Sequence, residues 1–290
     1  MTNTMLKGKE ISVAQALKIV GFPVKLGNIY TASGKKIPNK LVVERTDTKQ
    51  ALGIVSPAYK IIHHEDAIER PLRLLDKEGF KIKSIFFPRQ GSHAVIDLLS
   101  KESVKIDGDA FKFRLFMRNS YDGHSAFKIE VGLFRLICQN GAGVWAIGGK
   151  AKFEAKQIHM GDDKKFAEFY ETVAAKALSI KKTVPEYAKL FSSMKDVGVK
   201  NIESATKILN EMRLGERVTQ NVLNEWQKKE NYSPNVYGVY NGLTAYYSRQ
   251  EEKSKSDTVA LTNNGKTRGL LSELIALPSI KKAINLPSFN

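Results

Sequence analysis

The segment 111–118 alternates side chains that could bind an anion with side chains that could build a core. In a strand, one face would carry Phe111, Phe113, Leu115 and Met117. The opposite face would carry Lys112, Arg114, Phe116 and Arg118. Three cations and an aromatic ring on one sheet face suit a polyanion with bases that can stack. Cations on the solvent face of an antiparallel sheet also serve solubility, so this strand alone leaves both interpretations open.

Neighbouring predicted strands carry further cations that could merge with this face into one groove along a single strand of nucleic acid. The predicted nucleic-acid-binding residues are Lys81, Lys83, Lys112, Arg114, Arg118, Tyr121, Lys128, Arg135 and Arg45. Tyr121 falls in a polar turn and is the predicted stacking residue. For both Arg45 and Arg135, two roles are considered: contact with a phosphate, or pairing with an acidic residue inside the protein.

A second group of residues has the chemistry of metal ligands. It consists of Asp122, His124, His63 and His64, and it could centre a metal-dependent hydrolase. No histidine pair has the spacing of a helical zinc site. The dipeptide Asp122-Gly123 is also typical of a tight turn, in which Asp bonds its own backbone and Gly takes a positive φ. The turn is the favoured interpretation, so no catalytic residue, metal or cofactor is predicted.

The charge of the chain points to an anionic partner. The 290 residues contain 46 Lys or Arg and 30 Asp or Glu, which gives a formal net charge of +16. Such an excess most often indicates nucleic acid. The sequence has no apolar run long enough to span a membrane, its N-terminus lacks a signal core, and Cys138 is the only cysteine. We therefore expect no membrane partner, no intrachain disulfide and a cytoplasmic location.

The elements that must position these residues form an α+β pattern, with an antiparallel sheet first and helices later. The spacing predicts a helix over 12–20, a hairpin over 41–62 with its turn at 46–50, and a helix over 64–78. Four strands follow, at 80–87, 92–99, 111–119 and 125–137, with a bulge near Gly132. Later helices are expected at 166–180, 185–194, 202–213, 216–229, 235–249 and 270–286. This divides the chain into a sheet-rich domain, 1–150, and a helical region, 151–290, with a mobile loop at 251–268.

Three segments carry a family resemblance: VVERTDTKQALGIVSPAYKIIHHEDA, NSYDGHSAFKIEVGLFRLICQN and NVYGVYNGLTAYYSR. They resemble the signature blocks of a phage- and plasmid-borne family catalogued as a domain of unknown function, nine-three-two. In the first block the matching positions are Arg45, Asp47, Thr48, Leu52, Gly53, Ile54, Val55 and Tyr59. In the second they are Asn119, Ser120, Asp122, Gly123, Arg135, Cys138, Gln139 and Asn140. Of these, Asn119, Ser120, Asp122 and Gly123 are expected to shape a turn at the rim of the binding face.

The order of elements is similar to that of Rad-fifty-two-type single-strand annealing proteins: a hairpin, a helix, a Gly-aromatic pair and three strands. This likeness implies a ring or filament of identical subunits that holds single-stranded DNA in a basic groove.

The predicted function is therefore single-stranded DNA binding, with strand annealing as an accompanying activity, in phage or plasmid recombination. Two alternatives remain open. One is a metal-dependent nuclease or related hydrolase centred on Asp122, His124 and either His63 or His64. The other is a phage protein whose basic face binds and blocks a host factor.

Overall fold

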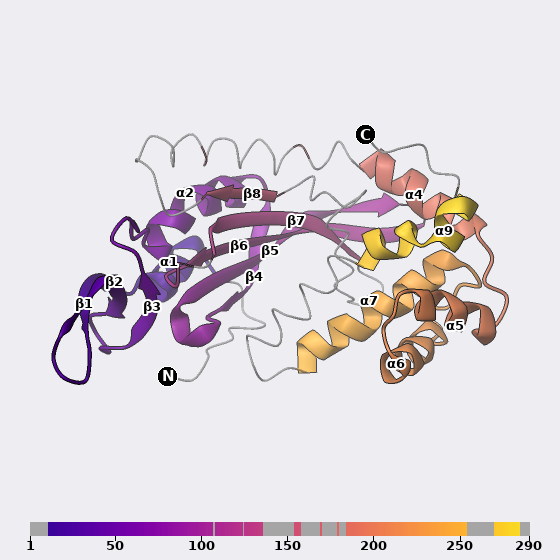
Figure 1. Ribbon diagram of the computed structural model, residues 1–290. Coiled ribbons are helices and arrows are strands. Elements are labelled where there is room, and N and C mark those ends of the chain that lie inside the picture. Colours follow the sequence, from indigo (N-terminus) through magenta and orange to yellow (C-terminus); the bar gives the residue numbers. More distant parts are fainter. Residues whose placement is uncertain are drawn as a thin grey trace.

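The computed structural model describes residues 11–106, 108–123, 125–135, 154–157, 169, 179, 184–253 and 270–284. Over these residues the chain has the predicted α+β order, with two antiparallel sheets followed by helices (Figure 1). The smaller sheet lies at one end of the molecule in this view, and the later helices gather at the other end.

The small sheet has three strands in the order β1-β2-β3, with β1 at Val24–Tyr30, β2 at Lys36–Arg45 and β3 at Ala51–Val55. Before it comes helix α1, Val13–Val20. This helix begins with a capping box, in which Ser12 and Gln15 each bond the other's backbone N–H. The hairpin predicted over 41–62 is confirmed by the pairing of β2 with β3.

The large sheet has five strands in the order β4-β5-β6-β7-β8. Their bounds are β4 Phe80–Phe86, β5 His93–Ile106, β6 Asp109–Ser120, β7 Phe127–Arg135 and β8 Glu154–Gln157. The helix α2, His64–Lys77, precedes β4, and the short 3-10 turn η1, Arg89–Gly91, joins β4 to β5. Because β8 begins past residue 150, the sheet extends across the predicted domain boundary.

The two faces of β6 alternate as predicted. Phe111, Phe113, Leu115 and Met117 all lie in the main hydrophobic core with residues of α1 and α2. The bulge predicted near Gly132 is wrong, because the β6–β7 register runs without a shift and pairs Gly132 with Arg114. Arg135 interrupts the apolar pattern of β7 because its guanidinium is paired inside the protein, as described below, and the strand keeps its register.

The helices of the second half have bounds close to those expected. They are α4 Val184–Asp196, α5 Ile202–Glu211, α6 Glu216–Trp226, α7 Val236–Lys253 and α9 Pro278–Ile284. Residues 270–276 are also helical, so the single helix predicted over 270–286 is interrupted before Pro278. Helix α7 includes the first three residues of the predicted loop, and 254–268 lie outside the described residues, as does most of the helix predicted over 166–180.

The helices share one hydrophobic core with the large sheet. Phe111 of β6 stacks on Phe191 of α4, with ring centroids 5.6 Å apart. Tyr237 of α7 packs against the same Phe191 ring at 5.1 Å. These contacts, and the core cluster that contains them, draw side chains from both halves of the chain. None of the helices in the described ranges is long and apolar enough to cross a membrane.

Candidate functional site

The turn between β6 and β7 lies where the small sheet meets the large sheet. Tyr121 belongs to the core cluster of the small sheet, together with Val43 of β2 and Val55 of β3. The backbone of β3 comes so close to this turn that a Cβ on Gly53 would lie 2.5 Å from the Cα of Asp122. Gly123 has a φ of +72°, which glycine adopts without strain. We call this region the junction.

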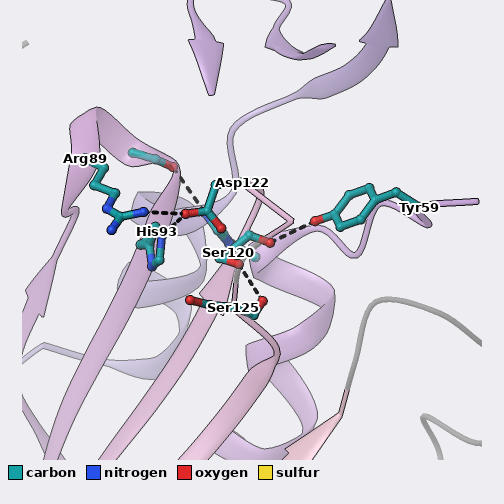
Figure 2. Close-up of polar contacts among 8 residues, drawn as sticks. Tyr59, Arg89, His93, Ser120, Asp122 and Ser125 are labelled. Atoms are coloured by element: carbon teal, nitrogen blue, oxygen red, sulfur yellow. Dashed lines mark hydrogen bonds and ion pairs between the residues drawn. The ribbon is translucent and has the colours of Figure 1, made fainter. Parts of the chain in front are cut away.

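Polar contacts hold the turn of the junction in place (Figure 2). Asp122 Oδ2 accepts hydrogen bonds from Arg89 Nη1 at 2.9 Å and from His93 Nε2 at 2.5 Å. The Tyr59 hydroxyl donates to the carbonyl of Ser120 at 3.0 Å, and Ser120 Oγ donates to the carbonyl of Ser125 at 2.7 Å. Asp122 is buried and its Oδ2 is engaged by Arg89 and His93, so the carboxylate anchors the turn rather than facing solvent.

The predicted stacking residue, Tyr121, is fully buried at 0% exposure. Its ring stacks on His64 at 3.9 Å, and its hydroxyl accepts a hydrogen bond from the His64 backbone N–H at 2.8 Å. Burial raises the pKa of the Tyr121 hydroxyl above its usual range. The prediction that Tyr121 stacks on a base is therefore wrong for this structure, because the residues of the small sheet cover a turn that looks polar in sequence.

The alternative metal site finds little support in the geometry. His64 is fully buried, with Nδ1 2.9 Å from the Asn119 amide nitrogen and Nε2 3.3 Å from the Gly91 carbonyl oxygen. The Asn119 amide also donates to the Ile62 carbonyl at 2.9 Å. Asp122 instead contacts Arg89 and His93, so it has different partners from His64. In the part of the chain that the structure describes, no three potential ligands gather around one point. His63 is the residue before α2, and His124 lies outside the described residues.

Arg45 is the first of three predicted phosphate contacts that turn out to be buried and paired. Its Nε and Nη2 donate to the two carboxylate oxygens of Asp47 at 2.9 Å and 2.6 Å. The guanidinium also lies over the Phe22 ring, 3.9 Å from its centroid. Hydrogen bonding from Arg45 lowers the pKa of the Asp47 carboxyl. Of the two roles predicted for Arg45, structural pairing is the one that this geometry fits.

Arg114 and Arg135 are paired more deeply still. Arg114 is 2% exposed and donates from Nε and Nη2 to the two oxygens of Asp97, each at 2.9 Å. Arg135 donates to Asp109 at 2.8 Å, and the Tyr237 hydroxyl donates to the other oxygen of Asp109 at 2.6 Å. The prediction that Arg114 lies on an open face is wrong, because a buried carboxylate on the neighbouring strand engages its guanidinium.

Five of the predicted cations keep part of their side chains exposed and share one face of the large sheet. They are Lys81, Lys83, Lys112, Arg118 and Lys128, and we call them the cationic face. Strand register places four of them there, and Lys83, at the register shift of β4, is placed there by its ammonium group, 4.0 Å from Asp97. Lys83 is the most open, with 41% of its side chain exposed. Lys81 is 34% exposed and forms an ion pair with Asp76 at 2.6 Å. A buried cluster of Phe86, Val95 and Phe116 occupies the centre of this face, so the cations border it.

Sequence reasoning missed the partners that bury these arginines. Asp97 lies in the apolar run AVIDLL of β5, where an acid inside an otherwise buried strand signals a buried cation nearby. The pairing of His93 and Arg89 with Asp122 is not visible in the sequence, because Asp122 lies 29 residues after His93 and 33 residues after Arg89. The predicted binding residues also omit the exposed lysines of the small sheet, although the basic turn with Lys35 and Lys36 is visible in the sequence.

The match to known families agrees with the motifs found at the junction. Residues 51–268 match the family model described as "Domain of unknown function (DUF932)". No curated protein and no solved structure matches the chain. The matched region contains Gly53, Tyr59 and the whole β6–β7 turn, which meet at the junction. Because the match covers most of its length, the chain belongs to the DUF932 family.

Proposed function

We propose that this protein binds single-stranded nucleic acid along the cationic face of the large sheet. The observation that carries the proposal is the register. It brings Lys112 and Arg118 of β6 to the same face as Lys128 of β7 and Lys81 of β4. Each of these side chains is partly exposed. A row of cations that spans several strands can follow a phosphate backbone without reading its sequence.

The internal pairing of the arginines sharpens this proposal. Arg114 lies on the same face as the cations but is paired with Asp97, which leaves four lysines and Arg118 as the partly exposed cations of this face. Lysine is a compact, mobile charge that suits sequence-independent phosphate contact. The formal net charge of +16 favours association with a polyanion.

The proposal extends to strand annealing in phage or plasmid recombination, in the cytoplasm of a bacterial host, by a homo-oligomeric ring or filament. Its support is the order of a β2–β3 hairpin, α2 and the strands β4 to β6, the element order on which the resemblance to annealing proteins rests. Binding alone needs no catalytic step and no cofactor.

Fluorescence anisotropy with labelled single-stranded and duplex DNA over a salt series tests the proposal. We expect tighter binding to the single strand and a steep loss of affinity with salt. The double variant Lys83→Ala, Lys112→Ala should lower the slope of log K against log salt by about 1.4, because each lost phosphate contact to a single strand contributes about 0.7.

The matched control is Lys189→Ala, Lys200→Ala. It removes two exposed lysines, one from α4 and one from the loop between α4 and α5. This control should keep the slope of the unaltered protein. Equal slopes for the two double variants would remove the cationic face from the proposal. Absence of binding at low salt would refute nucleic-acid binding itself and favour the host-factor alternative.

A further inference from the structure

The tip of the β1–β2 hairpin is a firmly built turn. The backbone N–H of Thr31 donates to the Lys35 carbonyl at 2.8 Å, and the N–H of Gly34 donates to the Thr31 carbonyl at 2.9 Å. Thr31 Oγ1 accepts from the Lys35 N–H at 3.1 Å and contacts Ser33 Oγ at 2.9 Å. Gly34 has a φ of +78°, as such a turn requires. The residues on either side of this turn are therefore presented on a defined scaffold.

An aromatic ring stands exposed beside this turn. Tyr30 is the last residue of β1, pairs with Lys36 across the hairpin and is 57% exposed. Most tyrosines among the described residues are packed in hydrophobic cores, whereas the ring of Tyr30 is open to solvent. A ring that stands beside a hydrogen-bonded turn and is open to solvent can stack on a base.

The charge around Tyr30 is almost entirely positive. Between Val24 and Lys60 the chain has seven Lys or Arg residues and two acidic residues. The two acids, Glu44 and Asp47, lie next to cations of the same sheet, with Glu44 4.0 Å from Lys25 and Asp47 paired with Arg45. Among the described residues no ion pair involves the exposed lysines Lys35, Lys36, Lys40 and Lys49.

We infer that this hairpin tip is a second contact for single-stranded nucleic acid, separate from the cationic face. Tyr30 stacks on one unpaired base, and Lys35, Lys36 and Lys40 lie along the adjoining phosphates. The inference rests on the proposed function and deepens it, since it names the element that engages bases. An exposed ring among unpaired lysines favours a single strand over a duplex, because bases inside a duplex are already stacked on each other.

The stacking role is tested with Tyr30→Ala and Tyr30→Phe in the full chain, by anisotropy with a labelled single strand. We expect Tyr30→Ala to bind about fivefold to a hundredfold more weakly, and Tyr30→Phe to keep most of the affinity. The matched control is Tyr232→Ala, which removes a tyrosine of similar exposure, 54%, from the loop between α6 and α7. That control should bind like the unaltered protein.

The phosphate role is tested with Lys35→Ala, Lys36→Ala against Lys281→Ala, Lys282→Ala. Both double variants remove two adjacent exposed lysines, the first pair from the hairpin and the second from α9. Only the hairpin variant should lower the salt slope, again by about 1.4. Thermal unfolding checks that each variant folds.

The outcomes separate this inference from the function on which it rests. If the unaltered chain binds single strands, and Tyr30→Ala and the Lys35→Ala, Lys36→Ala variant bind them equally well, the inferred hairpin contact is refuted and the proposed function stands. If the unaltered chain binds no single strand at low salt, both fall. If the hairpin variants lose affinity for an acidic peptide such as polyglutamate but none for DNA, the hairpin is a protein-binding element and the inference is overturned.

Discussion

At the scale of single residues, three buried arginines differ in role from the lysines of the small sheet. Arg45, Arg114 and Arg135 are buried and each donates to a carboxylate. The planar guanidinium can satisfy both oxygens of a carboxylate at once, so it tolerates burial where an ammonium group would not. The exposed positive charge of the small sheet, by contrast, comes from lysines. Charge counted from the sequence therefore overstates what is open to a ligand.

Removing the Arg114 guanidinium should destabilise the fold. In Arg114→Leu the Asp97 carboxylate, which is 0% exposed, would lose its bidentate partner in the sheet interior. We expect a loss of about 3–5 kcal/mol in the free energy of unfolding, measured by urea denaturation. Combining Arg114→Leu with Asp97→Leu should restore much of this loss.

The control for this prediction is Lys112→Ala, on the same strand and face but partly exposed. It should change the free energy of unfolding by less than about 0.5 kcal/mol. A loss under about 1 kcal/mol in Arg114→Leu would show that the pair contributes little to folding.

At the scale of elements, the junction depends on close approach between β3 and the β6–β7 turn. A Cβ at Gly53 would lie 2.5 Å from the Asp122 Cα and 2.7 Å from the Tyr121 carbonyl oxygen. Both are backbone atoms, so the clash could not be relieved by a change of side-chain rotamer and the backbone itself would have to shift. The motif glycine of the first block and the motif turn of the second are thus a packing pair.

Gly53→Ala should therefore separate the small sheet from the large sheet locally. We expect about 1–3 kcal/mol lower unfolding free energy, the usual cost of overpacking, and faster amide exchange in β3. Gly198→Ala is the control, since a Cβ there would meet nothing within 4 Å. Equal stability and exchange in the two variants would contradict the close approach.

At the scale of the whole molecule, tyrosines are buried in each part of the described structure. Burial raises the pKa of Tyr59 and Tyr121 at the junction and of Tyr187, Tyr237 and Tyr240 among the helices. Each folded-state pKa lies above the ordinary value of 10.0. The native protein therefore keeps these protons at pH values where the unfolded chain releases them.

This difference predicts a loss of stability in alkali. Below the ordinary pKa the tyrosines are protonated in both the native and the unfolded state, so they do not make the free energy of unfolding depend on pH. Above pH 10.0 the unfolded state binds fewer protons than the native state, so stability must fall as pH rises. Urea denaturation from about pH 8 to about pH 11, with tyrosinate absorbance as a second readout, checks this. An unchanged midpoint over this range would contradict the burial of these hydroxyls.

How far the sequence anticipates this protein depends on whether a signal is local. The helix over 12–20, the β2–β3 hairpin and the alternation of β6 follow from neighbouring residues, because capping, turn chemistry and side-chain periodicity act over a few positions. The family motifs are visible for the same reason. The register of β7 was mispredicted because Arg135 looked like a break in an apolar face.

By itself, the sequence determined the class of fold, the positions of most strands and helices, the net charge and the family. Only the tertiary structure decided which cations face solvent. Arg114 meets Asp97 across 17 positions, Arg135 meets Asp109 across 26, and Tyr121 stacks on His64 although 57 positions separate them. Whether a charge is buried with a partner or open to a ligand depends on which distant residues folding brings beside it, and no local pattern identifies that partner.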